Sequence, residues 1–161
     1  MKLRMLATAL LLMQLGGCSF LFGDDEEIPE LPSLVCYSIY ADPDVNLNVS
    51  GQPTPISLQV FQLEDDSMFL DASFDELIDD YGSALGSTYV DHVDYVLKPG
   101  QFKFVELFDV EEDTKFIAVF GKYAEPNKTQ WKKIIRIKPL NKRYRLMVYL
   151  GSDEAKMSIV E

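Results

Sequence analysis

The chain has 161 residues, which is the size of one domain with a sizeable core. Its formal net charge at pH 7 is −11, and nucleic acid or a flat anionic lipid surface repels a protein this acidic. We therefore expect no nucleic acid partner and no electrostatic docking on anionic lipid.

The first 17 residues have the three parts of a lipoprotein signal peptide. Lys2 and Arg4 make a basic start, an apolar run follows, and two small glycines stand before Cys18. A spanning helix needs about 20 apolar residues, and Gln14 interrupts this run. We expect residues 1–17 to be a cleaved signal peptide and Cys18 to carry the lipid, since its thiol takes the diacylglyceryl group.

Residues 18–33 are predicted to form a lipidated tether. The run Asp24-Asp25-Glu26-Glu27 cannot build a core, and two prolines keep the following backbone extended. In Gram-negative lipoproteins, an Asp after the lipidated cysteine retains the protein in the inner membrane, whereas Ser permits export. Ser19 therefore indicates a lipid anchor on the periplasmic face of the outer membrane.

Residues 34–161 are predicted to form one all-β domain, a β-sandwich, because short runs rich in β-branched and aromatic residues alternate with turn residues. The one convincing helix lies around residues 73–81, where Ser73 and Glu76 make a capping box and Gly82 ends the helix. The expected strands are residues 34–41, 56–63, 89–97, 102–108, 115–123, 131–138, 143–150 and 155–160.

The sequence offers little catalytic or metal chemistry. His92 is the only histidine, which is too few for a zinc site and leaves a Ser-His-Asp triad without support. The run from Asp42 begins like a calcium loop, but its sixth and twelfth positions are Leu47 and Pro53 instead of Gly and Glu. Cys36 is read as a small apolar strand residue. We expect no catalytic residue, metal, cofactor or small-molecule substrate.

Charge is unevenly distributed along the chain. No Lys or Arg occurs between Ser19 and Leu97, and most basic residues of the body lie between Lys128 and Arg145. Such runs are usually solvated faces that keep a protein soluble, although a basic stripe can also steer a charged partner. Both interpretations of the stripe stay open at this point.

The body also resembles the TssJ (SciN/VasD) family, the outer-membrane lipoproteins of type VI secretion systems. The resemblance spans nearly all of the chain after the signal peptide, and the ordered set of segments is more specific than any one of them. The segments that carry it are Asn46, Gly51-Gln52-Pro53-Thr54-Pro55, residues 56–63, Phe69, residues 72–77, Leu85-Gly86, Leu97-Lys98-Pro99-Gly100, residues 116–120, Tyr123 and Trp131.

The resemblance implies a transthyretin-like β-sandwich with added helical segments. It further implies a non-catalytic protein that anchors the secretion membrane complex to the outer membrane by binding the periplasmic C-terminal region of the inner-membrane protein TssM. The residues alone leave a different class open, a periplasmic ligand-binding or cell-wall-associated lipoprotein unrelated to secretion.

In the family, much of the partner contact comes from the loop between the first two strands, which is Asp42–Pro55 in this chain. An exposed Val and Leu in a polar loop suit an interface, although both could instead fold back onto the sandwich. The expected partner-binding residues are Asp44, Val45, Asn46, Leu47 and Asn48.

Overall fold

The computed structural model describes residues 30–160 of the chain. The signal peptide expected at residues 1–17, the lipidation expected at Cys18 and most of the tether expected at residues 18–33 lie outside this range. The elements in chain order are β1 (Leu34–Ala41), β2 (Ile56–Leu63), α2 (Ser67–Asp71), α3 (Phe74–Leu85), η2 (Gly86–Thr88), β3 (Tyr89–Leu97), β4 (Phe102–Asp109), β5 (Phe116–Lys122), η3 (Pro126–Lys128), β6 (Lys132–Arg136), β7 (Arg143–Leu150) and β8 (Ala155–Ile159).

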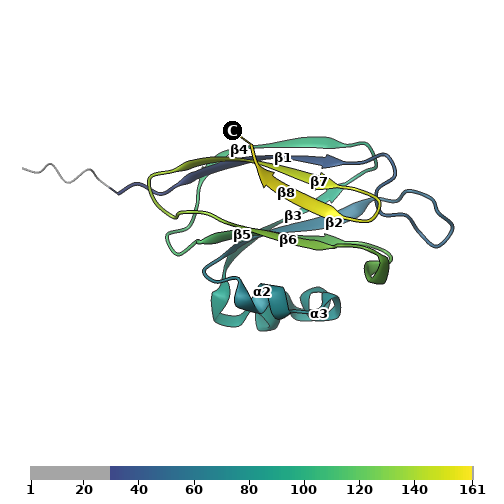
Figure 1. The fold of residues 1–161 in the computed structure, drawn as a ribbon, viewed down its shortest axis with the longest axis horizontal. Helices are drawn as coiled ribbons and strands as arrows, with labels where there is room; N and C mark the ends of the chain where they lie inside the picture. The colour runs from purple at the N-terminus through teal and green to yellow at the C-terminus, as the bar shows by residue number, and fades with distance from the viewer. Residues whose placement is uncertain (1–29, 161) are drawn as a thin grey trace, which may run out of the picture.

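Two four-stranded sheets pack face to face, which confirms the predicted all-β sandwich (Figure 1). One sheet has the order β4-β1-β7-β8 and the other has the order β3-β2-β5-β6. β1 and β7 run parallel, whereas the other strand pairs are antiparallel. A tight turn, closed by the bond from the Gln101 N–H to the Lys98 carbonyl (3.0 Å), joins β3 to β4, yet these strands belong to different sheets.

The main core lies between the sheets and follows from period-2 alternation along the strands. Inward-facing side chains such as Ile39, Leu58, Val119 and Val148 are fully or almost fully buried. On β7, Leu146, Val148 and Leu150 face inward and are buried, whereas Arg143 and Arg145 are exposed. β5 is a central strand, paired with β2 and β6, and it is buried on both faces: Ile117 and Val119 lie in the core between the sheets, and Ala118 and Phe120 lie on the side covered by the helices.

A second apolar cluster joins the outer face of the β3-β2-β5-β6 sheet to α2 and α3, which cover that face in Figure 1. It contains Phe61, Phe69, Leu77 and Phe120, all with no exposed surface. α3 begins with the predicted capping box: the Ser73 hydroxyl accepts the Glu76 N–H (3.3 Å), and the Glu76 carboxylate accepts the Ser73 N–H (2.8 Å).

The predicted end of this helix at Gly82 is wrong, because α3 continues to Leu85. The chain does leave helical geometry at Asp80 (φ −156°, ψ 80°), where the first helical segment stops. The Asp80 carboxylate then caps a further turn by accepting the Ser83 N–H (3.0 Å) and hydroxyl (2.6 Å). The helix therefore restarts from a capping residue, which the glycine alone does not indicate.

Lys132, within the basic stripe, holds the short helix α2 against the sheet. Its ammonium group donates to the carbonyls of Phe69 (2.8 Å), Leu70 (2.6 Å) and Ala72 (2.8 Å), at the C-terminal end of α2. These carbonyls have no partner within the helix, so the lysine supplies the donors they lack. Burial lowers the pKa of Lys132 below its usual value. Within the basic stripe, Lys132 therefore has a structural role.

Candidate functional site: the loop between β1 and β2

The loop from Asp42 to Pro55 projects from the end of the sandwich opposite to the end where the described chain begins (Figure 1). Its outer part folds back on itself, with an isolated antiparallel bridge between Leu47 and Pro53. The Asn48 side-chain oxygen accepts the N–H groups of Ser50 (2.9 Å) and Gln52 (3.0 Å). The tip of the loop is therefore a hydrogen-bonded turn with its own internal support.

Asn46 anchors the base of the loop. Its side-chain amide donates to the Thr54 hydroxyl (2.9 Å) and the Pro55 carbonyl (2.8 Å), and its oxygen accepts the Ala124 N–H (2.7 Å). The backbone of Asn46 is left-handed (φ 51°), a conformation that Asn adopts more readily than most residues. Because its side chain is only 6% exposed, Asn46 shapes the loop and leaves little surface for a partner.

Val45 does not have the exposure that the sequence analysis expected. Its side chain is fully buried in the core between the sheets. The Val45 N–H donates to the Asp42 carbonyl (3.0 Å), and this turn directs the valine inward. Burying an apolar side chain is favourable, so the open alternative in which Val45 folds back onto the sandwich is the correct one.

The solvent-facing part of the loop comprises exposed Asp44 and half-buried Leu47 and Asn48. The most exposed apolar residue of the loop lies outside the predicted partner-binding set. Val49 lies at the tip and is 90% exposed. The signal for it was present, since Val49 lies beside Ser50-Gly51, and these turn-forming residues mark the point where the chain reverses.

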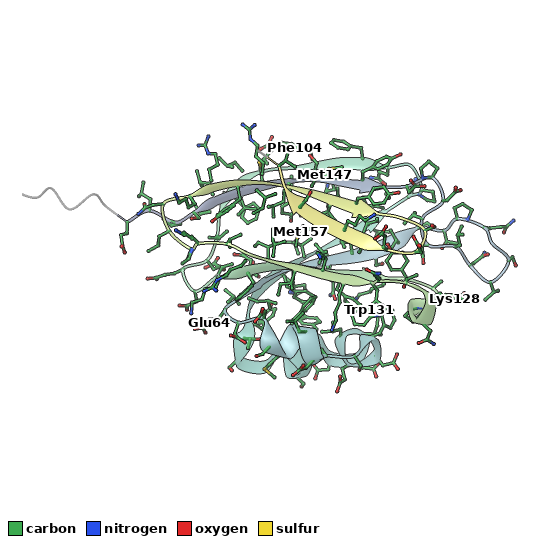
Figure 2. The ribbon with its side chains drawn as sticks, viewed as in Figure 1. Glu64, Phe104, Lys128, Trp131, Met147 and Met157 are labelled. Carbon is green, nitrogen blue, oxygen red and sulfur yellow. The ribbon has the colours of Figure 1, made fainter. Side chains whose placement is uncertain are left out.

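Beside the loop lies an open hollow of about 380 Å³. Leu47 and Val49 form one side of it, and the η3 turn and the turn between β7 and β8 form the others. Figure 2 shows Lys128 at this end of the molecule. In the η3 region Lys128 pairs with Glu125, so both charges border the hollow. The arrangement is an apolar tip next to a polar concavity, which suits a protein surface better than a small molecule.

Hydrogen bonds of a buried tyrosine hold the wall behind this hollow. The buried Tyr123 hydroxyl donates to the carbonyls of Glu154 (2.8 Å) and Gly151 (3.2 Å), in the turn between β7 and β8. Burial raises the pKa of Tyr123 well above its ordinary value. This hydroxyl therefore stays protonated and keeps donating at any physiological pH.

The candidates for catalysis and metal binding have structural partners. His92 Nδ1 lies 2.8 Å from the Tyr89 hydroxyl, and its ring stacks on Phe61. The Asp42 carboxylate, where the calcium-like run begins, accepts the Asp44 N–H (2.9 Å) and the Tyr149 hydroxyl (2.8 Å). Within residues 30–160, no group of three or more His, Cys, Asp or Glu side chains could hold a metal ion.

Comparison with protein families gives one match. The family described as "Type VI secretion lipoprotein, VasD, EvfM, TssJ" matches residues 34–153, which is nearly the whole described body. No curated protein sequence matches the chain significantly. Within residues 30–160, no helix has the length and hydrophobicity needed to cross a bilayer.

Solved structures share the fold. The T6SS lipoprotein TssJ1 from Pseudomonas aeruginosa superposes with a TM-score of 0.76 at 22% identity, covering 81% of this chain and 98% of that one. Serratia marcescens Lip, a membrane-bound component of the type VI secretion system, gives 0.71 at 24% identity with the same coverage. A chain from the structure of the T6SS protein TssM C-terminal domain from EAEC gives 0.64 at 18% identity, covering 80% and 98%.

Proposed function

Because the chain belongs to the family of type VI secretion lipoproteins, we propose that it is a non-catalytic, lipid-anchored protein of the outer membrane that binds the periplasmic C-terminal region of TssM. It would thereby connect the outer membrane to the inner-membrane part of the secretion complex. The observation that carries the proposal is the hydrogen-bonded loop between β1 and β2, which presents an exposed Val49 at the end of the sandwich opposite to the start of the described chain.

Membrane attachment is assigned to Cys18, and Ser19 supports the outer membrane as its location. Each buried methylene of an acyl chain contributes about 0.8 kcal/mol, so stable attachment takes two or more chains, and three would hold firmly.

We expect Cys18→Ser to release the protein into the periplasm and to abolish secretion, while the body stays folded. Cell fractionation followed by immunoblotting measures the location, and thermal unfolding of the purified body measures the fold. If the variant remained with the membranes, lipidation of Cys18 would not be the anchor.

Partner contact is assigned to Asp44, Leu47, Asn48 and Val49, with Val45 and Asn46 as the buried support of the loop. Preorganisation favours this assignment, since a loop that is already ordered loses little conformational entropy on binding. The hydrogen bonds of Asn46 and Asn48 supply that order. A relative of the same fold occurs in a structure named for the TssM C-terminal domain, which supports TssM as the partner.

The binding test is titration calorimetry of the soluble body against the periplasmic domain of the cognate TssM. Val49→Asp should weaken binding by about 2 kcal/mol, roughly thirtyfold, because it places a charge where an apolar contact is buried. The matched control is Val96→Asp, which makes the same change at an exposed valine (68%) of β3 and should leave the affinity unchanged.

The outcomes separate the parts of the proposal. Binding that both variants retain would keep TssM as the partner and reject the loop tip as the contact. No binding by the unaltered body would reject the partner itself, and the alternative class of periplasmic ligand-binding or cell-wall-associated lipoprotein would then have to be tested.

A further inference from the structure

The outer face of the β4-β1-β7-β8 sheet carries an apolar hollow of about 610 Å³. Figure 2 labels Phe104 and Met147 on this side of the molecule, away from the helices. Cys36 and Ser38 of β1 form the floor, and Phe104, Leu107 and Val160 stand around it. The three surrounding side chains are exposed, with Phe104 at 58%. Exposed apolar side chains that gather around a hollow make it a candidate docking surface.

The two outer faces of the sandwich are therefore unlike. α2 and α3 cover the face of the β3-β2-β5-β6 sheet, where Phe61 and Phe120 are fully buried. Within residues 30–160, no helix covers the opposite face, and its apolar side chains meet solvent.

The rim of the hollow is basic. Arg143 and Arg145 line it, and none of the described residues that line it is acidic. Within residues 30–160 neither arginine forms an ion pair. The hollow thus combines an apolar floor with two available guanidinium groups, which suits an occupant that carries both apolar side chains and carboxylates.

The order of these features along the face is informative. β1 and β7 are parallel, with Leu34 opposite Arg143 and Ser38 opposite Met147. The arginines therefore lie nearer to the end where the described chain begins, and the apolar side chains lie farther along the sheet. Arg143 and Met147 are about 13 Å apart along the strand, at ~3.3 Å per residue.

The chain ahead of Glu30 carries its charged and apolar residues in the corresponding order. Reading from Glu30 toward Cys18, the acidic run of residues 24–27 comes first, and the apolar run Phe20-Leu21-Phe22 follows after Gly23. About five residues separate the centres of the two runs, which is roughly 16 Å in an extended chain. The spacing therefore matches that of the arginines and the apolar side chains on the sheet.

The structure also fixes where this segment leaves the body. The Leu31 N–H donates to the Asn141 side-chain oxygen (3.0 Å), and the Asn141 N–H donates to the Leu31 carbonyl (2.9 Å). Two residues beyond Asn141, β7 begins with Arg143. An extended stretch of residues 24–29 spans up to about 20 Å, which is enough to turn back over both arginines.

We propose that residues 20–27 of this chain dock on the outer face of the β4-β1-β7-β8 sheet. Phe20 and Phe22 enter the hollow, and the carboxylates of residues 24–27 pair with Arg143 and Arg145. The attachment to the same chain gives the segment a high effective concentration, on the order of millimolar. A second copy of the chain is a poorer occupant, because its net charge of −11 repels this one.

Docking sets how far the body stands from the lipid. Fully extended, the 12 residue-to-residue steps from Cys18 to Glu30 would reach about 40 Å. When docked, Cys18 lies against the sheet and the body lies close to the bilayer. The segment thus has a short state and a long state, and their balance depends on salt, because paired charges guide the docking. This inference does not depend on the proposed partner.

The direct test is methionine-methyl NMR on the mature chain from residue 18, carrying Cys18→Ser, Cys36→Ser and a nitroxide on Ser19→Cys. Docking places the label beside Met147, so the Met147 signal should be lost by paramagnetic broadening. Met68 lies on α2, at the opposite face of the sandwich, and its signal should stay sharp.

A charge-neutral variant tests the pairing with the arginines and should restore the Met147 signal; it carries Asp24→Asn, Asp25→Asn, Glu26→Gln and Glu27→Gln. A matched control removes the same charge from exposed positions elsewhere and should keep the broadening; it carries Asp75→Asn, Asp79→Asn, Glu112→Gln and Asp113→Asn. A sharp Met147 signal in the parent, or equal broadening in the neutral variant, would overturn the proposal. Broadening between differently labelled molecules would assign the hollow to a second copy.

The second measurement uses Cys36, which lies on the floor of the hollow and is 9% exposed. In a chain with Cys18→Ser alone, docking should slow modification of Cys36 by a thiol reagent about tenfold relative to the same chain with Phe20→Ser and Phe22→Ser, a factor worth about 1.4 kcal/mol. Equal rates in the two chains would show that these phenylalanines do not cover the hollow, and the proposal would fail.

Discussion

At the scale of single residues, Asn46 does the most to shape the loop between β1 and β2. One side chain bonds to three residues from two segments, namely the adjacent Thr54 and Pro55 and the distant Ala124. Its backbone adopts the left-handed conformation at the same point. A buried amide with these bonds is costly to remove, because its partners would be left without water or protein to bond.

Comparing two substitutions separates the two roles of Asn46. Asn46→Gly keeps the left-handed backbone accessible but loses the side-chain bonds, and should lower the free energy of unfolding by about 2 kcal/mol. Asn46→Ala loses the bonds and also strains the backbone, and should cost about 1 kcal/mol more. Urea denaturation measures both values. Equal stabilities for Asn46→Ala and the unaltered protein would contradict the anchoring role.

The sequence predicts the loop better than the part played by each residue within it. The loop bounds, Asp42 to Pro55, are confirmed by the strands on either side. The turn residues Ser50-Gly51 mark Val49 as exposed, but nothing in the sequence marks Val45 as buried, because it is also a valine among polar neighbours. Only the turn at Asp42, which is three-dimensional, sends Val45 inward.

At the scale of elements, every predicted strand exists, because alternation of apolar and polar residues is a local property. The choice of partner strand is not local. β3 and β4 are joined by a tight turn at Pro99-Gly100, yet they pair with β2 and β1 in different sheets. The helix α2 has only five residues, and its N-cap residue Asp66 makes no side-chain capping bond. The packing of Phe69 in the second apolar cluster and the bonds from Lys132 therefore stabilise it.

Lys132→Met tests how α2 is held. The substitution keeps the length of the side chain but leaves three carbonyls without their donor, so the free energy of unfolding should fall by about 2 kcal/mol. Lys133→Met is the matched control, since Lys133 is exposed on the same strand, and it should stay within about 0.5 kcal/mol of the unaltered protein. Trp131, the only tryptophan, reports the transition by fluorescence. Equal losses for both variants would exclude a specific role for Lys132.

At the scale of the whole molecule, two tyrosines make the stability of the sandwich depend on pH. The Tyr37 hydroxyl lies 2.8 Å from that of Tyr95, and Tyr123 bonds to the turn between β7 and β8. Burial raises the pKa of both Tyr37 and Tyr123 well above 10. The folded state therefore keeps two protons that the unfolded state releases above pH 10.

Stability should consequently be intact below pH 10 and fall as pH rises further, by about 1.4 kcal/mol per pH unit for each of the two tyrosines. Lys132 acts in the opposite direction, because its lowered pKa lets the folded state release a proton before the unfolded state does. Urea denaturation between about pH 9 and 11 measures the slope. Tyr37→Phe and Tyr123→Phe should each reduce it, and an unchanged slope in both would exclude these groups as its source.

The position of β1 has a mechanical consequence for a protein held at both ends. β1 connects the segment at Ser33 directly to the loop at Asp42, and it lies inside its sheet between β4 and β7. With lipid at one end and a partner at the other, tension would run along this single strand. Its hydrogen bonds to both neighbours lie across the direction of pull, so they would resist together in shear and would not open one at a time. We therefore expect the body to bear load between two membranes without unfolding.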